Sequence, residues 1–318
     1  MEFDLIELIR QRTAQARDDV RLGIGDDAAV LAVPAGQELA VAIDTLVEDV
    51  HFPRGTDPAD IGWKALAVNL SDLAAMGASP AWALLGLTLP QADRAFVEGF
   101  ADGFSRLAGA HRLALVGGDT TRGPLTVSVA VHGFVPPGKA LTRAGACVGD
   151  AVLVTGTLGD AAAGLNVLQQ WRRDEDDRGQ LRDYLVERLN RPTPRLAAGV
   201  ALREQAHACV DVSDGLLADL GHICAASGVG AEIDAALLPR SSALLGLYDD
   251  ATALQFALGG GDDYELCFTV PPQRLSQVQA DLSRLGCGVT RIGRIVAGSG
   301  ERVRDQAGNW LEPGTPGW

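Results

Sequence analysis

Several familiar signatures are missing from this sequence, and each absence excludes a class of protein. No Cys-x-x-Cys pair and no His-Glu-x-x-His motif occurs, so a zinc site has little support. The five cysteines are odd in number and widely spaced, which is typical of reduced, mostly buried thiols. No apolar run approaches membrane-spanning length, and the charged residues 1–10 do not resemble a signal peptide. Together these absences predict a soluble cytoplasmic protein with no membrane partner.

Aromatic residues and basic residues are also scarce. Aromatic residues make up only 5% of the chain against 47% hydrophobic residues, so the cores are expected to be aliphatic. The net charge is −14, which excludes non-specific attraction to nucleic acid. Lys64 is the one lysine before position 139. An acidic chain of this kind needs metal ions, or a few well-placed arginines, to handle an anionic substrate.

The nucleotide-binding motifs that depend on bare backbone N–H groups or on lysine are absent as well. There is no Gly-x-x-x-x-Gly-Lys-[Ser/Thr] loop and no His-Arg-Asp signature of protein kinases. The run Gly23-Ile-Gly-Asp-Asp27 followed by Ala28 matches Gly-x-Gly-x-x-Ala, but a phosphate there would meet two carboxylates. Like charges about 4 Å apart repel by about 4 kcal/mol at a surface-like dielectric. Either this loop binds no phosphate, or cations lie between the phosphate and the two carboxylates.

Length and punctuation predict two domains. A chain of 318 residues exceeds one typical domain, and Pro136-Pro137-Gly138 interrupts the pattern near its middle. We therefore expect domains over residues 1–137 and 138–318. Strands and helices mix without strict βαβ alternation, which indicates an α+β fold in both. The strand over residues 125–135 alternates cleanly and is expected to be half-buried and antiparallel.

Aspartates recur where apolar strands are expected to end: Asp44, Asp119 and Asp214 each follow such a strand, and the Gly-Asp loop stands beside a strand expected over residues 28–33. A strand end holds a ligand group more rigidly than a loop tip does. Asp72 differs, because it lies in an otherwise apolar helix predicted over residues 59–76 and is expected to point inward or into a cleft. A single aspartate of this kind is more often a cap or an ion-paired turn residue. Five or six with so few lysines nearby favour a shared Mg²⁺ site, since Mg²⁺ prefers hard oxygen ligands.

Two arginines are placed where phosphate could be bound. Arg122 follows Gly117-Gly118-Asp119-Thr-Thr, where a predicted Gly-Gly turn would offer N–H groups and hydroxyls. Arg143 follows the predicted domain break. Arginine suits phosphate because its planar guanidinium donates two parallel hydrogen bonds. A surface arginine without a role is an equally good interpretation of each.

Six ordered motifs, spread over nearly the whole chain, resemble those of the thiamine-monophosphate kinases, a family in the aminoimidazole ribonucleotide synthetase-like superfamily. The motifs are Gly23-Ile-Gly-Asp-Asp27, Asp44-Thr-Leu-Val-Glu-Asp-Val-His-Phe52, Lys64-Ala-Leu-Ala-Val-Asn-Leu-Ser-Asp-Leu-Ala-Ala-Met-Gly-Ala78, Gly117-Gly-Asp-Thr-Thr-Arg-Gly-Pro124, Asp211-Val-Ser-Asp-Gly215 and Gly260-Gly-Asp-Asp-Tyr-Glu-Leu266.

The resemblance implies a fold and a reaction. The fold is the two-domain α+β architecture of that superfamily, with the first domain binding metal and ATP and forming the dimer, and the second completing the ATP and substrate cleft. The reaction is ATP-dependent phosphorylation of thiamine monophosphate to thiamine diphosphate with several Mg²⁺ ions. A homodimer that pairs the sheets of its N-terminal domains is implied too.

Carried over position by position, the resemblance also implies site residues. The implied Mg²⁺ ligands are Asp27, Asp44, Asp72, Asp119, Asp211 and Asp214. The implied ATP contacts are Gly118, Asp119, Arg143 and Ser213. The implied substrate contacts are His51, Asp262 and the terminal Trp318, whose ring would stack on thiamine. The chain departs from the family at Ala42 and Ile43, where hydroxyl residues are frequent, and the stretch Trp171–Asp183 matches no motif.

The chemistry agrees with this residue set. The attacking phosphate oxygen of thiamine monophosphate is already anionic near neutral pH, so no side chain is expected to act as a general base. Positioning and charge neutralisation provide most of what phosphoryl transfer needs, and we expect direct in-line transfer without a phosphoenzyme.

Three other interpretations compete: an enzyme like aminoimidazole ribonucleotide synthetase, a selenophosphate synthetase, and a non-catalytic regulator that binds metal and nucleotide. Because the first cysteine is Cys147, the reactive N-terminal cysteine of selenophosphate synthetases is missing.

Overall fold

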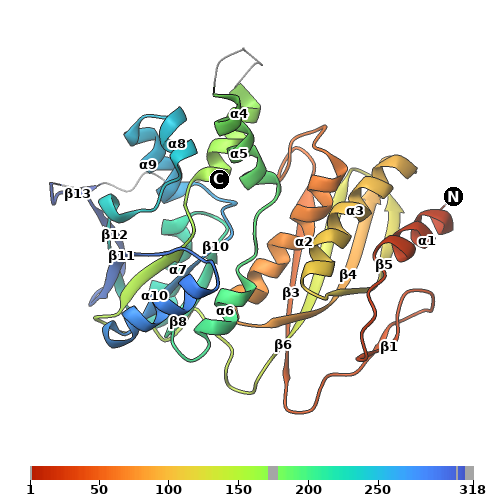
Figure 1. The fold of residues 1–318 in the computed structure, drawn as a ribbon, viewed down its shortest axis with the longest axis horizontal. Coiled ribbons are helices and arrows are strands. Elements are labelled where there is room, and N and C mark those ends of the chain that lie inside the picture. The colour runs from red at the N-terminus through yellow and green to blue at the C-terminus, as the bar shows by residue number, and fades with distance from the viewer. Residues whose placement is uncertain (1, 171–177, 306, 312–318) are drawn as a thin grey trace. The chain divides into compact units, whose positions relative to one another are not determined.

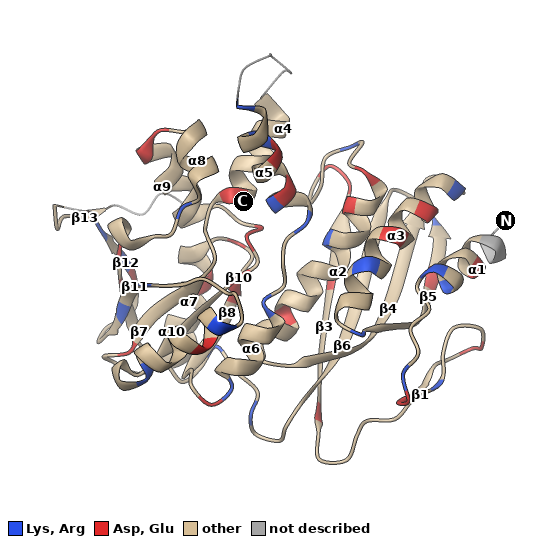
Figure 2. Ribbon diagram, viewed as in Figure 1, with Lys and Arg blue, Asp and Glu red and all other residues tan. Residues whose placement is uncertain are grey.

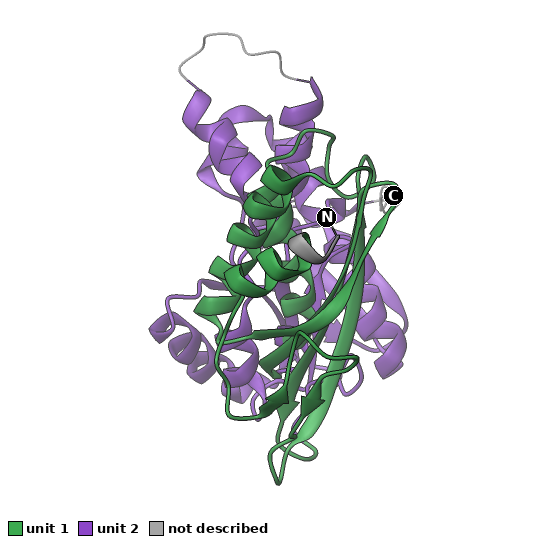
Figure 3. Cartoon of the chain, turned by 90° about the vertical axis from the view of Figure 1, so that its right-hand side faces the viewer, with its two compact units in different colours: residues 1–73, 78–138 green, residues 74–77, 139–318 purple. Residues whose placement is uncertain are grey.

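The computed structural model describes residues 2–170, 178–305 and 307–311, and the chain divides into two compact units (Figures 1 and 3). Unit 1 comprises Met1–Leu73 and Ala78–Gly138, and unit 2 comprises Ala74–Gly77 and Lys139–Trp318. Both units combine mixed sheets with helices, so the predicted α+β class is confirmed. None of the described helices is long and apolar enough to cross a membrane.

The elements up to the end of unit 1 form a sheet covered by helices. In chain order they are α1 (Glu2–Arg12), β1 (Val20–Leu22), β2 (Val30–Leu31), β3 (Glu38–Val47), α2 (Pro58–Ala75), β4 (Ser79–Leu89), α3 (Arg94–Ala110), β5 (Ala114–Arg122) and β6 (Thr126–Val135). The main sheet has the order β3-β6-β4-β5, with β4 and β5 parallel and the other pairs antiparallel. Helices α2 and α3 lie on one face of it (Figure 3).

The alternation predicted for β6 appears in the structure as a two-faced strand. Val127, Val129 and Val131 are at most 1% exposed, because they face the helices. The opposite face of the sheet leaves apolar side chains open, including Val41 and Ile43 of β3, which are 58% and 67% exposed.

Helix α2 begins and ends as its sequence predicts. The Asp57 carboxylate accepts a hydrogen bond from the Ala59 N–H at 2.8 Å, and Pro58 occupies the first helical position. After the helix, Gly77 adopts φ 63°, which glycine tolerates and most residues do not. Gly77 therefore fixes the point at which the chain leaves α2 and turns toward β4.

Helices α2 and α3 pack through glycine. A Cβ atom added to Gly103 of α3 would lie 1.8 Å from the Ala59 carbonyl oxygen, and one on Gly62 of α2 would lie 2.1 Å from the Phe100 carbonyl oxygen. The two backbones therefore touch directly.

Trp82 on β4, an interior strand of the sheet, fastens the chain between α1 and β1 to the sheet. It is 1% exposed, packs edge-on against Phe134 with ring centroids 5.0 Å apart, and donates its indole N–H to Asp19 at 3.0 Å. Asp19 is also paired with Arg17 at 2.6 Å. Asp19, the residue before β1, is thus bonded to both Trp82 and Arg17.

Unit 2 is built around a larger sheet. Its elements are β7 (Ala151–Thr155), α4 (Asp160–Gln170), α5 (Gly179–Asn190), α6 (Leu196–Leu202), β8 (Ala208–Val212), α7 (Leu216–Ser227), β9 (Gly230–Asp234), η1 (Ala235–Leu237), α8 (Ser242–Leu247), α9 (Asp250–Gly259), β10 (Glu265–Val270), η2 (Pro272–Arg274), α10 (Leu275–Arg284), β11 (Val289–Val296), β12 (Gly300–Arg304) and β13 (Trp310–Leu311). The sheet order is β13-β12-β9-β11-β7-β10-β8. β9 and β12 are parallel and the other neighbours are antiparallel.

The core of unit 2 is aliphatic, as the composition predicts. Helix α7 packs on the sheet through Leu216, Leu220 and Ile223, each 0% exposed. A second apolar cluster lies among α4, α5, α8 and α9. Four of the five cysteines are buried and all five are free thiols, which confirms the expected thiol state.

Two predicted local features are wrong. Gly117 and Gly118 do not form a turn, because β5 continues through both to Arg122, paired with β4. Asp44 likewise lies inside β3, three residues before the strand ends. Short-range patterns place a break at glycine or aspartate, but the ladder with a neighbouring strand overrides that preference.

The α2–α3 contact generates a stability prediction. Gly103→Ala should lower the free energy of unfolding by about 1–3 kcal/mol, because the new methyl group must displace backbone. The matched control is Gly109→Ala in the same helix, where the methyl would meet only the end of the Gln15 side chain at 3.2 Å. That change should stay within about 1 kcal/mol of the parent. Urea unfolding checks both, and equal stability of the two variants would contradict the packing argument.

Candidate active site

Two of the predicted metal ligands meet in unit 1. Asp44 on β3 and Asp72 on α2 share a side-chain hydrogen bond, although 28 positions separate them. Burial raises the pKa of Asp44, and the hydrogen bond with Asp72 and the nearby His51 oppose that shift. The Asp44 N–H donates to Asn69 Oδ1 at 3.0 Å, and Asn69 Nδ2 donates to the Ala65 carbonyl at 3.0 Å. The amide of Asn69 therefore fixes β3 against α2 where the carboxylates converge.

His51 lies in the turn after β3 and is oriented by the backbone. The Val47 N–H donates to its Nδ1 at 3.0 Å. Lys64, only 1% exposed, donates from Nζ to the His51 carbonyl oxygen at 3.1 Å. The ring is exposed and near Asp44, so the structure brings His51, Asp44 and Asp72 together.

Gly118 and Asp119 lie on the same sheet but on another strand. The register runs from Asp44 through β6 and β4 to Gly118, with Asp119 one residue farther along β5. Three strand spacings separate the β3 and β5 backbones by about 14 Å. Asp119 and Arg122 line a cavity of about 650 Å³, together with the two threonines between them. Asp119 is therefore placed beside this cavity and not against the Asp44–Asp72 pair.

Asp27 lies in the exposed loop between β1 and β2. Its N–H donates to the carboxylate of Asp26 at 2.9 Å. The strand predicted over residues 28–33 is reduced to Val30–Leu31, paired with Val20–Leu22. The loop is therefore the tip of a short two-stranded ribbon.

In unit 2, Asp211, Ser213 and Asp214 lie at the end of β8, ahead of α7. Asp219 on the first turn of α7 accepts the N–H groups of Ser213 at 2.9 Å and Asp214 at 3.0 Å. Burial raises the pKa of Asp219 to about 7. This carboxylate fixes the backbone of two of the three predicted site residues, Ser213 and Asp214.

Asp262 is held against the same turn. Its N–H donates to the Ser213 carbonyl at 2.8 Å, and Tyr264 donates its hydroxyl to the Asp262 carboxylate at 3.0 Å. Asp262 and Tyr264 adopt φ 68° and 50°, in the left-handed region that residues other than glycine rarely adopt. Such strain persists only where surrounding contacts enforce it, and it concentrates at functional sites.

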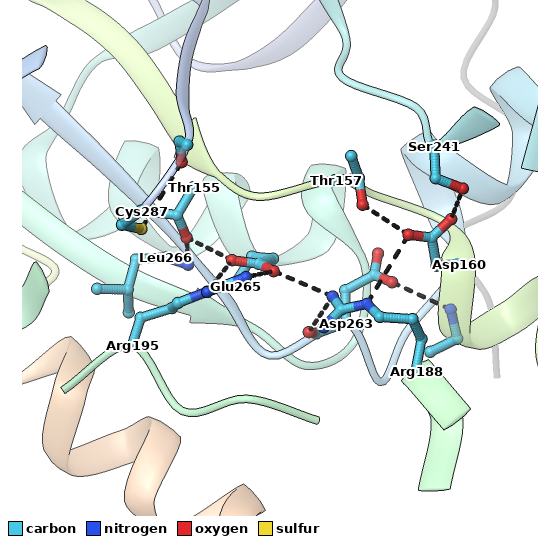
Figure 4. Close-up of polar contacts among 12 residues, drawn as sticks. Thr155, Thr157, Asp160, Arg188, Arg195, Ser241, Asp263, Glu265, Leu266 and Cys287 are labelled. Atoms are coloured by element: carbon cyan, nitrogen blue, oxygen red, sulfur yellow. Dashed lines mark hydrogen bonds and ion pairs between the residues drawn. The ribbon is translucent and has the colours of Figure 1, made fainter. Parts of the chain in front are cut away.

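Asp263 and Glu265, which follow Asp262 in the chain, belong to a buried polar network (Figure 4). Glu265, 0% exposed, accepts two hydrogen bonds from Arg195 at 2.6 and 2.5 Å and one from Arg188 at 3.0 Å. Asp263 accepts the Gly159 N–H at 2.6 Å and the Ala161 N–H at 3.2 Å. Asp263, which lies between the two strained residues, and Glu265, which follows them, are thus hydrogen-bonded within the interior.

Two predicted residues remain, Arg143 and Trp318. Arg143 is exposed, on the loop before β7, and its carbonyl accepts a hydrogen bond from Ser227 Oγ at 3.3 Å. Trp318 lies outside the described residues, as does the first part of the stretch Trp171–Asp183. Helix α5 begins at Gly179.

Sequence reasoning missed the residues that hold the site in place. Asn69 and Asp219 accept hydrogen bonds from backbone N–H groups of the candidate ligands, and neither is predicted as a ligand, although Asn69 stands within the motif that contains Asp72. Helical spacing could have indicated Asn69, which lies one turn before Asp72 on α2. Acidic residues occur in both units (Figure 2), so charge alone does not single out Asp219.

Two mixed-sheet units, each presenting aspartates beside strand backbone, define the class. Residues 25–135 match the AIR synthase related protein N-terminal domain, and residues 148–306 match the C-terminal domain of the same family. The chain belongs to this family, and within it to the thiamine-monophosphate kinases.

Individual relatives agree along the whole chain. Thiamine-monophosphate kinase of Escherichia coli strain K12 is 52% identical over 296 residues, covering 93% of this chain and 90% of the relative. The crystal structure of thiamine-monophosphate kinase from Stenotrophomonas maltophilia K279a is 53% identical with a TM-score of 0.89, covering 95% of this chain and 96% of that one. The structure of AaThiL complexed with AMPPCP and TMP is 33% identical with a TM-score of 0.77, covering 98% and 95%.

The buried Asp263 generates a pH prediction. Burial raises its pKa to about 8, whereas an unfolded aspartate titrates near about 4. Between these values the folded chain keeps a proton that the unfolded chain releases, so the free energy of unfolding should fall as the pH rises through this window. Asp263→Asn, which is neutral throughout, should flatten that slope.

Urea unfolding from about pH 5 to about pH 8 measures the slope. Asp183→Asn makes the same chemical change on an exposed face of α5 and provides the reference profile. An Asp263→Asn profile as steep as that of the parent would show that Asp263 does not hold the proton.

Proposed function

We propose that this chain catalyses ATP-dependent phosphorylation of thiamine monophosphate to thiamine diphosphate with Mg²⁺. Full-length similarity to thiamine-monophosphate kinases, and to a structure complexed with AMPPCP and TMP, supports the substrates. The observation that carries the mechanism is the Asp44–Asp72 pair. A carboxylate pair of this kind suits a reaction in which positive charge comes from metal.

The carboxylates of Asp44 and Asp72 suit a Mg²⁺ ion. The burial that raises the pKa of Asp44 disfavours two negative charges at the pair, and a divalent cation would relieve that repulsion. Oxygen ligands are also the donors that Mg²⁺ prefers. When bound, Mg²⁺ neutralises phosphate charge and orients the transferred group. Asp44 and Asp72 would hold one such ion, and Asp27, Asp119, Asp211 and Asp214 are the further proposed ligands of the several Mg²⁺ ions.

The chain's own residues orient the two substrates. Gly118, Asp119, Arg143 and Ser213 are the proposed ATP contacts, and His51, Asp262 and Trp318 the proposed contacts of thiamine monophosphate. A phosphate oxygen of thiamine monophosphate forms the new bond to the γ-phosphorus of ATP. The bond from that phosphorus to the β,γ-bridging oxygen breaks, and ADP leaves with the electron pair. The nucleophile is already ionised, so no side chain has to remove a proton.

Incubation of the chain with Mg²⁺-ATP and thiamine monophosphate should yield thiamine diphosphate and ADP in equal amounts. Asp72→Asn should lower this activity by two or more orders of magnitude, on the order of the loss when a charge-stabilising group is removed. Mg²⁺ should also raise the melting temperature of the parent more than that of Asp72→Asn, because the variant has lost a ligand.

The control is Asp102→Asn, which removes an exposed carboxylate of the same unit outside the proposed set. Near-parental turnover of Asp72→Asn would remove Asp72 from the metal site. ADP release without thiamine diphosphate would contradict the proposed acceptor and favour another reaction of the superfamily. Nucleotide binding without turnover would favour a regulator.

A cytoplasmic homodimer completes the proposal. The open face of the unit 1 sheet carries the exposed apolar side chains Leu39, Val41, Ile43 and Leu84. Contiguous apolar surface of this kind commonly marks a protein interface. The face suits a second copy of the chain paired sheet to sheet.

Val41→Lys should convert the dimer to a monomer, because it places an ammonium group among these exposed apolar side chains. Light scattering coupled to size exclusion should then report a mass near the 33.2 kDa of one chain. Val33→Lys makes the same substitution at an exposed valine outside the main sheet and should keep the parental mass. A Val41→Lys variant that remains dimeric would place the interface elsewhere.

A further inference from the structure

Three side chains of different chemistry converge on the surface of unit 2, and none of them belongs to the residues of the proposed active site. Cys147, Asp150 and His207 each bring one ligand atom within 4.8 Å of the others. His207 lies 57 positions after Asp150, so no motif in the sequence links them. We propose that Cys147, Asp150 and His207 form a binding site for a zinc-class divalent metal ion.

The cluster is already partly assembled. His207 Nδ1 and Asp150 Oδ2 are 2.8 Å apart, and the same carboxylate oxygen accepts the Cys147 N–H at 2.9 Å. The Cys147 thiol makes only a weak hydrogen bond to the Gly145 carbonyl, with sulfur and oxygen 3.4 Å apart. Ligand atoms of a tetrahedral zinc site lie about 3.5 Å apart. Small side-chain rotations would therefore complete the arrangement.

The backbone that carries the three ligands is rigidly held. The Asp150 N–H donates to the Cys147 carbonyl at 3.0 Å, which closes the turn between the two ligands. The Ile295 N–H donates to the Asp150 carbonyl at 2.8 Å, and the His207 N–H donates to the Thr269 carbonyl at 2.8 Å. Strand ladders thus anchor the ligands on both sides, and such anchoring lowers the cost of ordering a site.

The donor set selects the metal. A thiolate, an imidazole and a carboxylate are the three ligand types of zinc sites, whereas Mg²⁺ takes oxygen donors. The ionised thiol and carboxylate together balance a charge of two, with the imidazole neutral. Cys147 and His207 are exposed and Asp150 is buried, so an ion can enter from solvent and keep a fourth position for water. On binding, the thiol loses its proton to solvent and the metal–sulfur bond forms.

The test uses Co²⁺ as a spectroscopic probe on the untagged, chelator-treated chain. One equivalent should produce a near-ultraviolet thiolate-to-cobalt charge-transfer band, which Zn²⁺ should then abolish by displacement. Cys147→Ser should lose the band, and His207→Ala should weaken Co²⁺ binding at least about tenfold. Co²⁺ bound among aspartates would give no such band, so the proposed Mg²⁺ site does not interfere.

The matched control is His222→Ala, which removes another exposed histidine of unit 2 and should behave as the parent. Cys147 is the one exposed cysteine of the five, so its reaction with a thiol reagent gives a second readout. One equivalent of Zn²⁺ should slow that reaction in the parent and in His222→Ala, but not in His207→Ala. Absence of the band in the parent, or parental affinity in His207→Ala, would overturn the site. Melting curves confirm that each variant is folded.

Discussion

A carboxylate taken out of water must be compensated by another group, and this constraint shapes both units. The cost of an uncompensated buried charge is several kcal/mol, a large share of the stability of a typical domain. Unit 2 meets the constraint internally. Glu265 is surrounded by Arg188, Arg195 and a threonine hydroxyl, and Asp263 accepts backbone N–H groups. These groups therefore form a buried polar network beside the aliphatic core of that unit, and the network fixes the segment that contains Asp262.

Unit 1 meets the same constraint in a different way. Asp44 and Asp72 share a hydrogen bond, and the Asn69 side chain accepts the backbone N–H of Asp44. The Lys64 ammonium group donates to the carbonyl oxygen of His51. In the proposed function, a bound Mg²⁺ ion would provide the remaining compensation. On that proposal, the contrast between the two units would separate carboxylates that stabilise the fold from carboxylates that are kept for ligands, which their sequence contexts alone do not distinguish.

The sequence predicted the fold class, the free thiols and the inward position of Asp72, because each follows from local composition or helical period. It also placed helix α2, whose first turn is encoded by Asp57 and Pro58. It did not predict that β5 runs through Gly117 and Gly118, since a strand's extent depends on its partner. Nor did it indicate the supporting roles of Asn69 and Asp219, which arise from contacts that close only in the folded chain.

The ribbon formed by β1 and β2 has a consequence for the loop that carries Asp27. Asp19 is fastened to Trp82 just before the ribbon, and β1 pairs with β2 on either side of the loop. A loop whose ends are already joined has far fewer conformations than a free segment of equal length. Most of the entropy that a ligand would otherwise remove from this segment has therefore been lost when the protein folds, and an exposed, acidic loop can still engage a ligand without a large ordering penalty.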